Sequence, residues 1–162
     1  MKTTFNIDRE KLQSSMERVF DAPIEALWKA HTDKELMAQW WGPKDYEIDV
    51  QEYDPTPGGK WRIIHRGKDE NGQEAEYAFY GEILEVEEND HMTWTFNFEP
   101  IGPGHEITET VSFTDLGDGK TKLSTISHYK SLEDLEGMLQ SGMEDGAEQT
   151  WNRLEDLAIS MI

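Results

Sequence analysis

A single carboxylate interrupts an otherwise apolar face of a segment that alternates like a β-strand. Glu109 shares this face with Ile107, Val111 and Phe113, because every second side chain of a strand points to the same side. A carboxyl group on an apolar face has a raised pKa and can serve as an acid, a base or an anchor for a cation. Two other placements stay open: Glu109 leans toward water near the end of its strand, or a β-bulge reverses the register there.

A histidine occupies a comparable position on another alternating segment. His65 shares a face with Trp61 and Ile63, and Tyr77 is expected nearby. Such a histidine either contacts a bound ligand or forms a hydrogen bond with a neighbour in the core or at its rim. The five histidines are scattered without the spacing of metal ligands, and the chain has no cysteine. We therefore expect neither a metal site nor a thiol nucleophile.

Motifs that would indicate a known type of catalysis do not occur in the sequence. It contains no nucleophile elbow, no phosphate-binding glycine loop and no dinucleotide fingerprint, and its Gly58-Gly59 and Gly102-Pro103-Gly104 segments fit turns. We therefore name no catalytic residue and expect no cofactor. An enzymatic role stays open, but a non-enzymatic one is favoured.

The periodicity of apolar residues predicts the elements that would position these side chains. A hairpin is expected from residues 3–20, followed by two short helices, one with Pro23 at its first position and one starting at the capping-box pattern Thr32-Asp33-Lys34-Glu35. Closely spaced turns then separate the alternating segments in the middle of the chain, which indicates an antiparallel meander. A short helix to about Gln140 and a longer one from about Met143 follow. The expected class is α+β.

Aromatic residues recur on the alternating faces of the middle strands. They either fill the core between the sheet and the last helix or line an apolar pocket with a few polar anchors. Gly142 and Gly146 favour a pocket, because they lie four residues apart and remove side-chain volume from one face of the last helix. The same glycines would also permit close contact between helix and strand. The aromatic set comprises Trp61, Tyr77, Phe79, Trp94 and Phe96.

The last helix carries an apolar stripe that includes a tryptophan. Trp151 follows Ala147 by four residues and precedes Leu154 by three, so it should face the sheet. A buried indole at this position would fasten the helix to the strands. We expect its role to be structural first.

Composition restricts the class of protein. The chain has 162 residues and suits a single domain, 1–162. Its 34 acidic and 15 basic side chains give a net charge of −19, which disfavours binding to nucleic acid. That charge either attracts a basic partner or a cationic ligand, or simply solvates the surface. No apolar run suits membrane insertion and no export signal is visible, so we expect a cytoplasmic protein, monomeric or homodimeric.

Six short motifs follow one another between about residues 16 and 158. They are Arg18-x-Phe20-Asp21-Ala22-Pro23, Trp28-Lys29-Ala30-x-Thr32-Asp33, Trp40-Trp41-Gly42-Pro43, Pro57-Gly58-Gly59-x-Trp61, Tyr80-Gly81-Glu82-Ile83 and Trp151-Asn152-Arg153-Leu154. Together they resemble the activator of heat-shock protein 90 ATPase homologue family, within the START-like, polyketide-cyclase-like helix-grip (SRPBCC) superfamily. The resemblance implies a curved antiparallel sheet wrapped around a long C-terminal helix, two short helices after the first strands, and a pocket between sheet and helix. Family members often have a Trp where this chain has Ala147.

The resemblance leaves three functions open. The favoured one is a non-enzymatic carrier or sensor that binds a small apolar or aromatic ligand in the cavity. The second is a stress protein that contacts a chaperone and activates its ATPase. The third is a cyclase- or dehydratase-type enzyme that uses Glu109 or His65 as acid or base. The residues expected to line the cavity are Trp61, Ile63, His65, Tyr77, Phe79, Trp94, Phe96, Glu109, Gly142, Met143 and Gly146.

Overall fold

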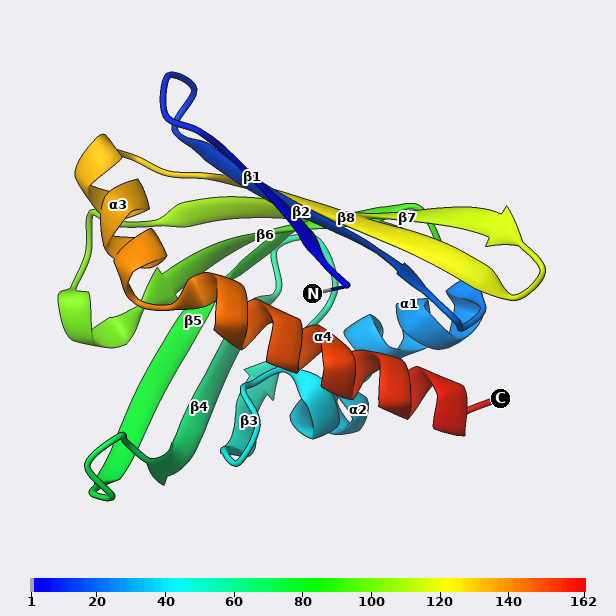
Figure 1. The fold of residues 1–162 in the computed structure, drawn as a ribbon, viewed down its shortest axis with the longest axis horizontal. Helices are drawn as coiled ribbons and strands as arrows, with labels where there is room; N and C mark the ends of the chain where they lie inside the picture. The colour runs from blue at the N-terminus through cyan, green and yellow to red at the C-terminus, as the bar shows by residue number, and fades with distance from the viewer. Residues whose placement is uncertain (1) are drawn as a thin grey trace.

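A curved, eight-stranded antiparallel sheet makes up most of the fold in a computed structural model that describes residues 2–162 (Figure 1). The strand order is β1-β2-β8-β7-β6-β5-β4-β3, so the N-terminal hairpin pairs with the last strand of the meander. The strands are β1 (Thr4–Asp8), β2 (Gln13–Phe20), β3 (Glu47–Tyr53), β4 (Lys60–Lys68), β5 (Glu74–Glu87), β6 (His91–Phe98), β7 (Ile107–Gly117) and β8 (Lys120–His128).

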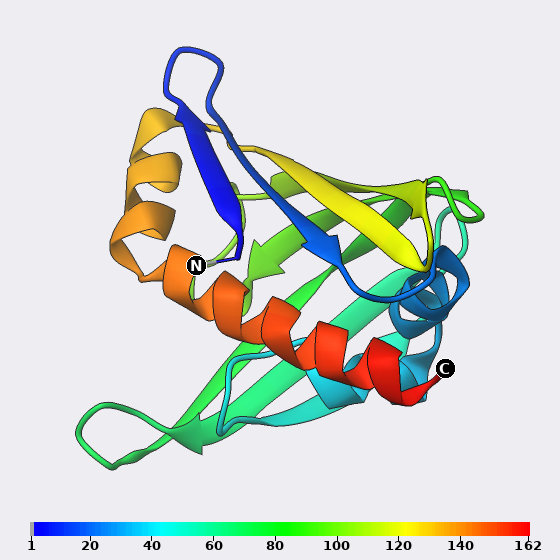
Figure 2. The same cartoon turned by 45° about the vertical axis from the view of Figure 1, so that its right-hand side comes forward.

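The helices lie on the concave side of this sheet. The longest helix, α4, crosses the concave face diagonally, as two views of the ribbon show (Figures 1 and 2). The helical elements are α1 (Ile24–Thr32), α2 (Lys34–Trp40), the short 3-10 turn η1 (Glu99–Ile101), α3 (Leu132–Gln140) and α4 (Met143–Ser160). This arrangement is the helix-grip α+β fold that the sequence predicts. Across residues 2–162, no helix combines the length and apolar character needed to cross a membrane.

Two helix starts differ in detail from the sequence-based prediction. Pro23 is the extended N-cap of α1, with ψ at 154°, and so lies one residue before the helix. The second helix is capped by Asp33 rather than by Thr32. The Thr32 hydroxyl donates to the carbonyl of Trp28 at 3.0 Å, while Oδ1 of Asp33 accepts from the backbone N–H of Glu35 at 2.9 Å. The hydroxyl is therefore engaged with the preceding helix, and the carboxylate one residue later takes over the cap.

Gly81 permits an indole to cross from one strand to another. A Cβ at this position would lie 1.9 Å from the carbonyl oxygen of Thr95 and 2.7 Å from Nε1 of Trp61. That Nε1 donates to the same carbonyl at 3.0 Å. Glycine is therefore required for the Trp61 side chain to run over β5 and tie β4 to β6.

The two halves of α4 are packed differently. In the C-terminal half, Trp151, Leu154, Glu155 and Ala158 are buried. The ring of Trp151 meets that of Phe20 edge-on, with 5.3 Å between centroids. The first half, residues 143–150, has no fully buried side chain. The helix is thus packed into the core through its C-terminal half, while its first half is held by hydrogen bonds such as those from the backbone of Lys2 to Glu148 and of Lys44 to Gln149.

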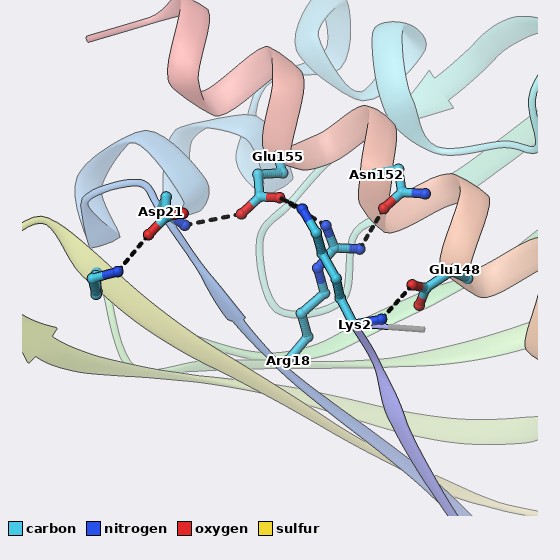
Figure 3. A network of polar contacts seen from close by, with 7 residues as sticks. Lys2, Arg18, Asp21, Glu148, Asn152 and Glu155 are labelled. Carbon is cyan, nitrogen blue, oxygen red and sulfur yellow. Dashed lines mark hydrogen bonds and ion pairs between the residues drawn. The ribbon is translucent and has the colours of Figure 1, made fainter.

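A buried ion pair holds the docked half of α4 against β2 (Figure 3). Arg18, with 1% of its side chain exposed, donates to Glu155 Oε1 at 2.8 Å and to Asn152 Oδ1 at 2.8 Å. The second oxygen of Glu155 accepts from the backbone N–H of Asp21 at 2.9 Å. Burial opposes ionisation of Glu155, but the hydrogen bonds from Asp21 and Arg18 outweigh it and lower the pKa. Lys2 adds a further contact at 3.2 Å.

We predict that Trp151→Ala lowers the free energy of unfolding by about 3–5 kcal/mol, the usual effect of truncating a large buried aromatic side chain. Trp151 is 3% exposed, so the substitution removes a side chain whose apolar surface is almost entirely buried. Urea denaturation measures the loss. Ile159→Ala is the control on the same helix, because Ile159 is 47% exposed and should change stability by less than about 0.5 kcal/mol. Equal effects of the two substitutions would contradict the placement of the helix.

Replacing one partner of the Arg18–Glu155 pair should lower the free energy of unfolding more than replacing both partners together. Glu155→Gln leaves the Arg18 cation buried without a counter-charge, which we expect to cost about 3–5 kcal/mol. The double variant Arg18→Met/Glu155→Gln should recover a large part of this loss, because the uncompensated charge is gone. Asp21→Asn is the control, since the ion pair of its side chain with Lys120 is exposed and should contribute little to stability. A strictly additive double variant would show that the two charges are not coupled.

Candidate functional site

A cavity of about 1040 Å³ lies between the concave face of the sheet and the loosely packed first half of α4. Its deep end reaches α1 and α2 at His31 and Trp40. Its other end includes Ile101 after η1 and residues of α3, and Ile101 is 53% exposed. We refer to this end, between η1 and α3, as the mouth of the cavity.

Nine of the eleven residues named from the sequence lie on the wall of this cavity. Most come from alternate positions of β4 to β7, and the glycines and the methionine come from the start of α4. They are His65, Tyr77, Phe79, Trp94, Phe96, Glu109, Gly142, Met143 and Gly146.

Trp61 and Ile63 are on the predicted face of β4 but belong to the packed core instead of the cavity wall. Their exposed fractions are 1% and 0%. Trp61 stacks on Trp94 with 4.2 Å between ring centroids and is met edge-on by Trp41 at 5.5 Å. Those two indoles reach the cavity and cover Trp61. Alternation predicts the face of a strand, but another side chain lying over that face decides what remains accessible.

Gly142 and Gly146 leave space next to the cavity. No heavy atom of the described residues lies within 4 Å of a Cβ built at either position. Close contact between helix and strand therefore does not explain these glycines. Gly142 differs from the prediction in one respect: it is the N-cap of α4, with φ at 82°, and precedes the helix. This left-handed conformation is a second reason for a glycine there.

Trp41 is the main wall residue that the sequence-based prediction did not include. Its indole lies between 5.2 and 6.1 Å, centroid to centroid, from the rings of five neighbours. Trp41 follows the last residue of α2, where neither helical nor strand periodicity applies. Its place in the Trp40-Trp41-Gly42-Pro43 motif was the available signal. The five neighbours are Trp61, His65, Phe79, Trp94 and Phe96.

Two side chains fix the backbone that carries Trp41. His65 donates from Nε2 to the carbonyl of Trp41 at 2.7 Å. Arg153 of α4 donates from Nη1 to the carbonyls of Gly42 and Pro43, at 3.0 and 2.9 Å. Gly42 suits this close approach, because a Cβ would lie 3.0 Å from Nε2 of His65, which is tighter than an ordinary van der Waals contact. The wall is therefore braced from β4 and from α4 at the same point.

Two of the three histidines of the wall, His31 and His65, are neutral. Burial lowers the pKa of His65 and of His31 to about 4, although each ring has a hydrogen bond to a carbonyl, which opposes the shift. His31 bonds the carbonyl of Leu27 through Nδ1 at 2.8 Å. The nitrogen that donates carries the proton, so the other nitrogen of each neutral ring is an acceptor.

Glu109 is the charged group deepest in the sheet wall. It lies on β7 directly between Trp94 of β6 and Ser127 of β8. The register of β7 is regular around it and shifts only after Asp115, so no bulge turns its side chain away from the concave face. Trp94 Nε1 donates to one carboxylate oxygen at 3.3 Å, and Ser127 Oγ donates to the other at 3.0 Å. Burial raises the pKa of Glu109, and these two hydrogen bonds oppose the rise.

The mouth is polar and partly bridged. His105, in the segment after η1, lies 2.7 Å from the carboxylate of Asp134 on α3. Glu136 of α3 pairs with Arg9 of the β1–β2 loop. Within residues 2–162, no group of three or more His, Asp or Glu side chains is arranged to hold a metal ion. The interior of the cavity can therefore offer a ligand apolar surface, two neutral histidines and the carboxyl group of Glu109, and Glu133, Asp134 and Glu136 add carboxylates at the mouth.

Acid should destabilise the protein through its buried histidines. A histidine with a folded-state pKa of about 4 and an ordinary value of 6.5 contributes no penalty above pH 6.5, and its penalty grows as the pH falls toward 4. For His65 the loss at pH 5 is on the order of 2 kcal/mol. Urea denaturation of the wild type and of His65→Gln at pH 7.5 and pH 5 measures it as a smaller pH effect in the variant. The exposed His128→Gln should retain the wild-type difference; a His65→Gln pH effect equal to the wild type would contradict the neutral, buried ring.

Comparison with known proteins agrees with this fold. The chain resembles a crystal structure of protein Ms6760 from Mycobacterium smegmatis, with 26% identity, 98% of each chain covered and a TM-score of 0.84. A solution structure from Arthrobacter aurescens is 24% identical, covers 99% of this chain and 93% of its own, and has a TM-score of 0.84. A Rhodobacter sphaeroides protein has the same TM-score at 18% identity, with 98% and 99% covered.

A search among curated proteins gave no match. The family model described as Activator of Hsp90 ATPase homolog 1-like protein matches residues 21–158, which is most of the chain. This match agrees with the helix-grip fold that the curved sheet and α4 form. The chain belongs to the family of Activator of Hsp90 ATPase homolog 1-like proteins.

Proposed function

We propose that this protein binds a small apolar or aromatic molecule in the cavity between the sheet and α4, as a carrier or sensor. The observation that supports this most strongly is the cavity itself, about 1040 Å³ with a wall of aromatic and methionine side chains. Ligand sites usually have volumes of roughly 300–1,000 Å³ and apolar walls with a few placed polar groups. The cavity fits that description.

The wall is built so that the cavity persists without a ligand. Trp41 is wedged among five rings, and the backbone around it is held by His65 and Arg153. A well-packed ring cannot move into the empty space without losing those contacts. Preformed sites of this kind bind apolar ligands without first reorganising.

The family description supports one alternative, an activator of a chaperone ATPase. Membership of the family is compatible with a ligand-binding or an activator-like role. An activator that contacts the chaperone through its outer surface would not need the cavity. Chaperone ATPase turnover with and without the protein separates the two, since acceleration that survives filling of the cavity would favour the activator role.

Filling the cavity from α4 tests the proposal with the neutral dye N-phenyl-1-naphthylamine, whose fluorescence rises in apolar surroundings. Gly146 is inside α4, and its Cβ position has open space. Gly146→Leu should therefore improve helix propensity, raise stability by about 0.5–1 kcal/mol and weaken dye binding at least about tenfold.

Gly146→Ala is the matched control. It gains the same helix propensity but occupies little of the cavity, so it should bind the dye like the wild type. Titration followed by fluorescence gives the dissociation constants, and thermal unfolding gives the stabilities. Absence of dye binding to the wild type, or equal binding by the Leu and Ala variants, would argue against a ligand in this cavity.

A further inference from the structure

The wall of the cavity contains a carboxyl group that no cation balances. Within residues 2–162, the wall includes no lysine and no arginine. Of its three histidines, His31 and His65 are neutral, and His105 at the mouth is engaged by the carboxylate of Asp134. The groups facing Glu109 are Trp94 from β6 and Ser127 from β8, and Tyr129, which follows β8, lies close enough to sense its charge. None of these side chains carries a positive charge at neutral pH.

The hydrogen bonds of Glu109 leave room for a ligand. Each carboxylate oxygen receives one donor, from Trp94 at 3.3 Å or from Ser127 at 3.0 Å. When it is ionised, a carboxylate offers about four acceptor positions, so roughly two remain beyond these two donors, and Glu109 lies on the cavity wall. An unsatisfied charged acceptor in an apolar enclosure is costly, and a ligand that donates to it removes that cost.

The surroundings of Glu109 favour a cation over a neutral donor. Trp94 covers one of its ring faces with Trp61, at an interplanar angle of 17°, and turns its N–H edge to Glu109. Trp41, at 88° to Trp94, lies on the same wall of the cavity. Faces of indole rings attract cations, most strongly where water is excluded. At the mouth, Glu133 adds a carboxylate, while Asp134 and Glu136 are already engaged by His105 and Arg9.

The same features oppose anionic ligands. An acid or a phosphate would bring its charge beside Glu109 into a cavity whose wall has no lysine and no arginine, in a chain with a net charge of −19. Such a charge would remain uncompensated in an apolar site. Fatty acids and phosphorylated molecules are therefore poor candidates.

We propose that the ligand of this cavity is a hydrophobic amine, bound as its ammonium ion with the nitrogen on Glu109 and the apolar body among the rings of Trp41, Trp94 and Phe96. This inference rests on the proposed function, because it names the chemical class of the molecule that the cavity binds. Burial raises the pKa of Glu109 in the free protein, and an ammonium group beside it lowers that pKa again. Binding of the cation and ionisation of the carboxyl group therefore favour each other.

Three probes with one apolar body and different heads test the inference: naphthalen-1-ylmethylamine, naphthalen-1-ylmethanol and 1-naphthoate. Isothermal titration calorimetry at pH 7 should rank them in that order, with the amine at least about tenfold tighter than the alcohol, as expected for a hydrogen bond to a charged group. Glu109→Gln should remove most of the amine's advantage and leave the alcohol within about threefold. Glu87→Gln, which neutralises an exposed carboxylate on β5, should leave the ranking unchanged.

The possible outcomes separate this inference from the function on which it rests. If the alcohol binds as tightly as the amine, or if both Gln variants weaken the amine equally, the inference is wrong while ligand binding stands. If none of the three probes and no neutral dye binds, both fall together. The ranking with the wild type decides the matter even if Glu109→Gln does not fold, because it needs no variant.

Discussion

The buried ion pair between Arg18 and Glu155 determines where α4 meets the sheet, and the rest of the structure depends on that position. Apolar side chains of similar volume could supply as much stability, because removing two charges from water costs about what their attraction returns. Apolar contacts can slide along a helix, however, whereas a guanidinium that donates to both Glu155 and Asn152 has a single register. The pair therefore fixes the position of α4 more than it adds to the total stability.

This fixed position has a direct consequence for the space under α4. The helix is anchored through Trp151 and the residues after it, and its first two turns have no buried side chain. Glycine at position 146 and alanine at position 147 add little volume there, so the sheet opposite them is not covered. Arg153 then links the anchored half to the Trp40–Pro43 segment. One set of contacts thus holds the helix and sets one wall of the cavity.

The elements were predictable from the sequence because their signals are local. Strand alternation and turn glycines each act within a few residues, and the structure has the antiparallel meander that they predict. The cap of α2 was assigned one residue early, because the Thr32 hydroxyl has a competing acceptor in α1. The wall of the cavity was harder to predict. Trp61 is covered by Trp41 and Trp94, which come from other segments of the chain. The periodicity of a single segment cannot predict such a contact.

Glu109 differs from the residues that build the container. Its only hydrogen bonds within residues 2–162 join it to side chains of the neighbouring strands, and no helix or loop is anchored through it. The charges that dominate the outer surface are screened within about 8 Å at physiological salt, so they act weakly inside the cavity. A carboxyl group in an apolar enclosure is screened far less. Arg18, Glu155 and the tryptophans thus hold the sheet and α4 in place. The charge preference of the cavity depends instead on Glu109, which is not part of those contacts.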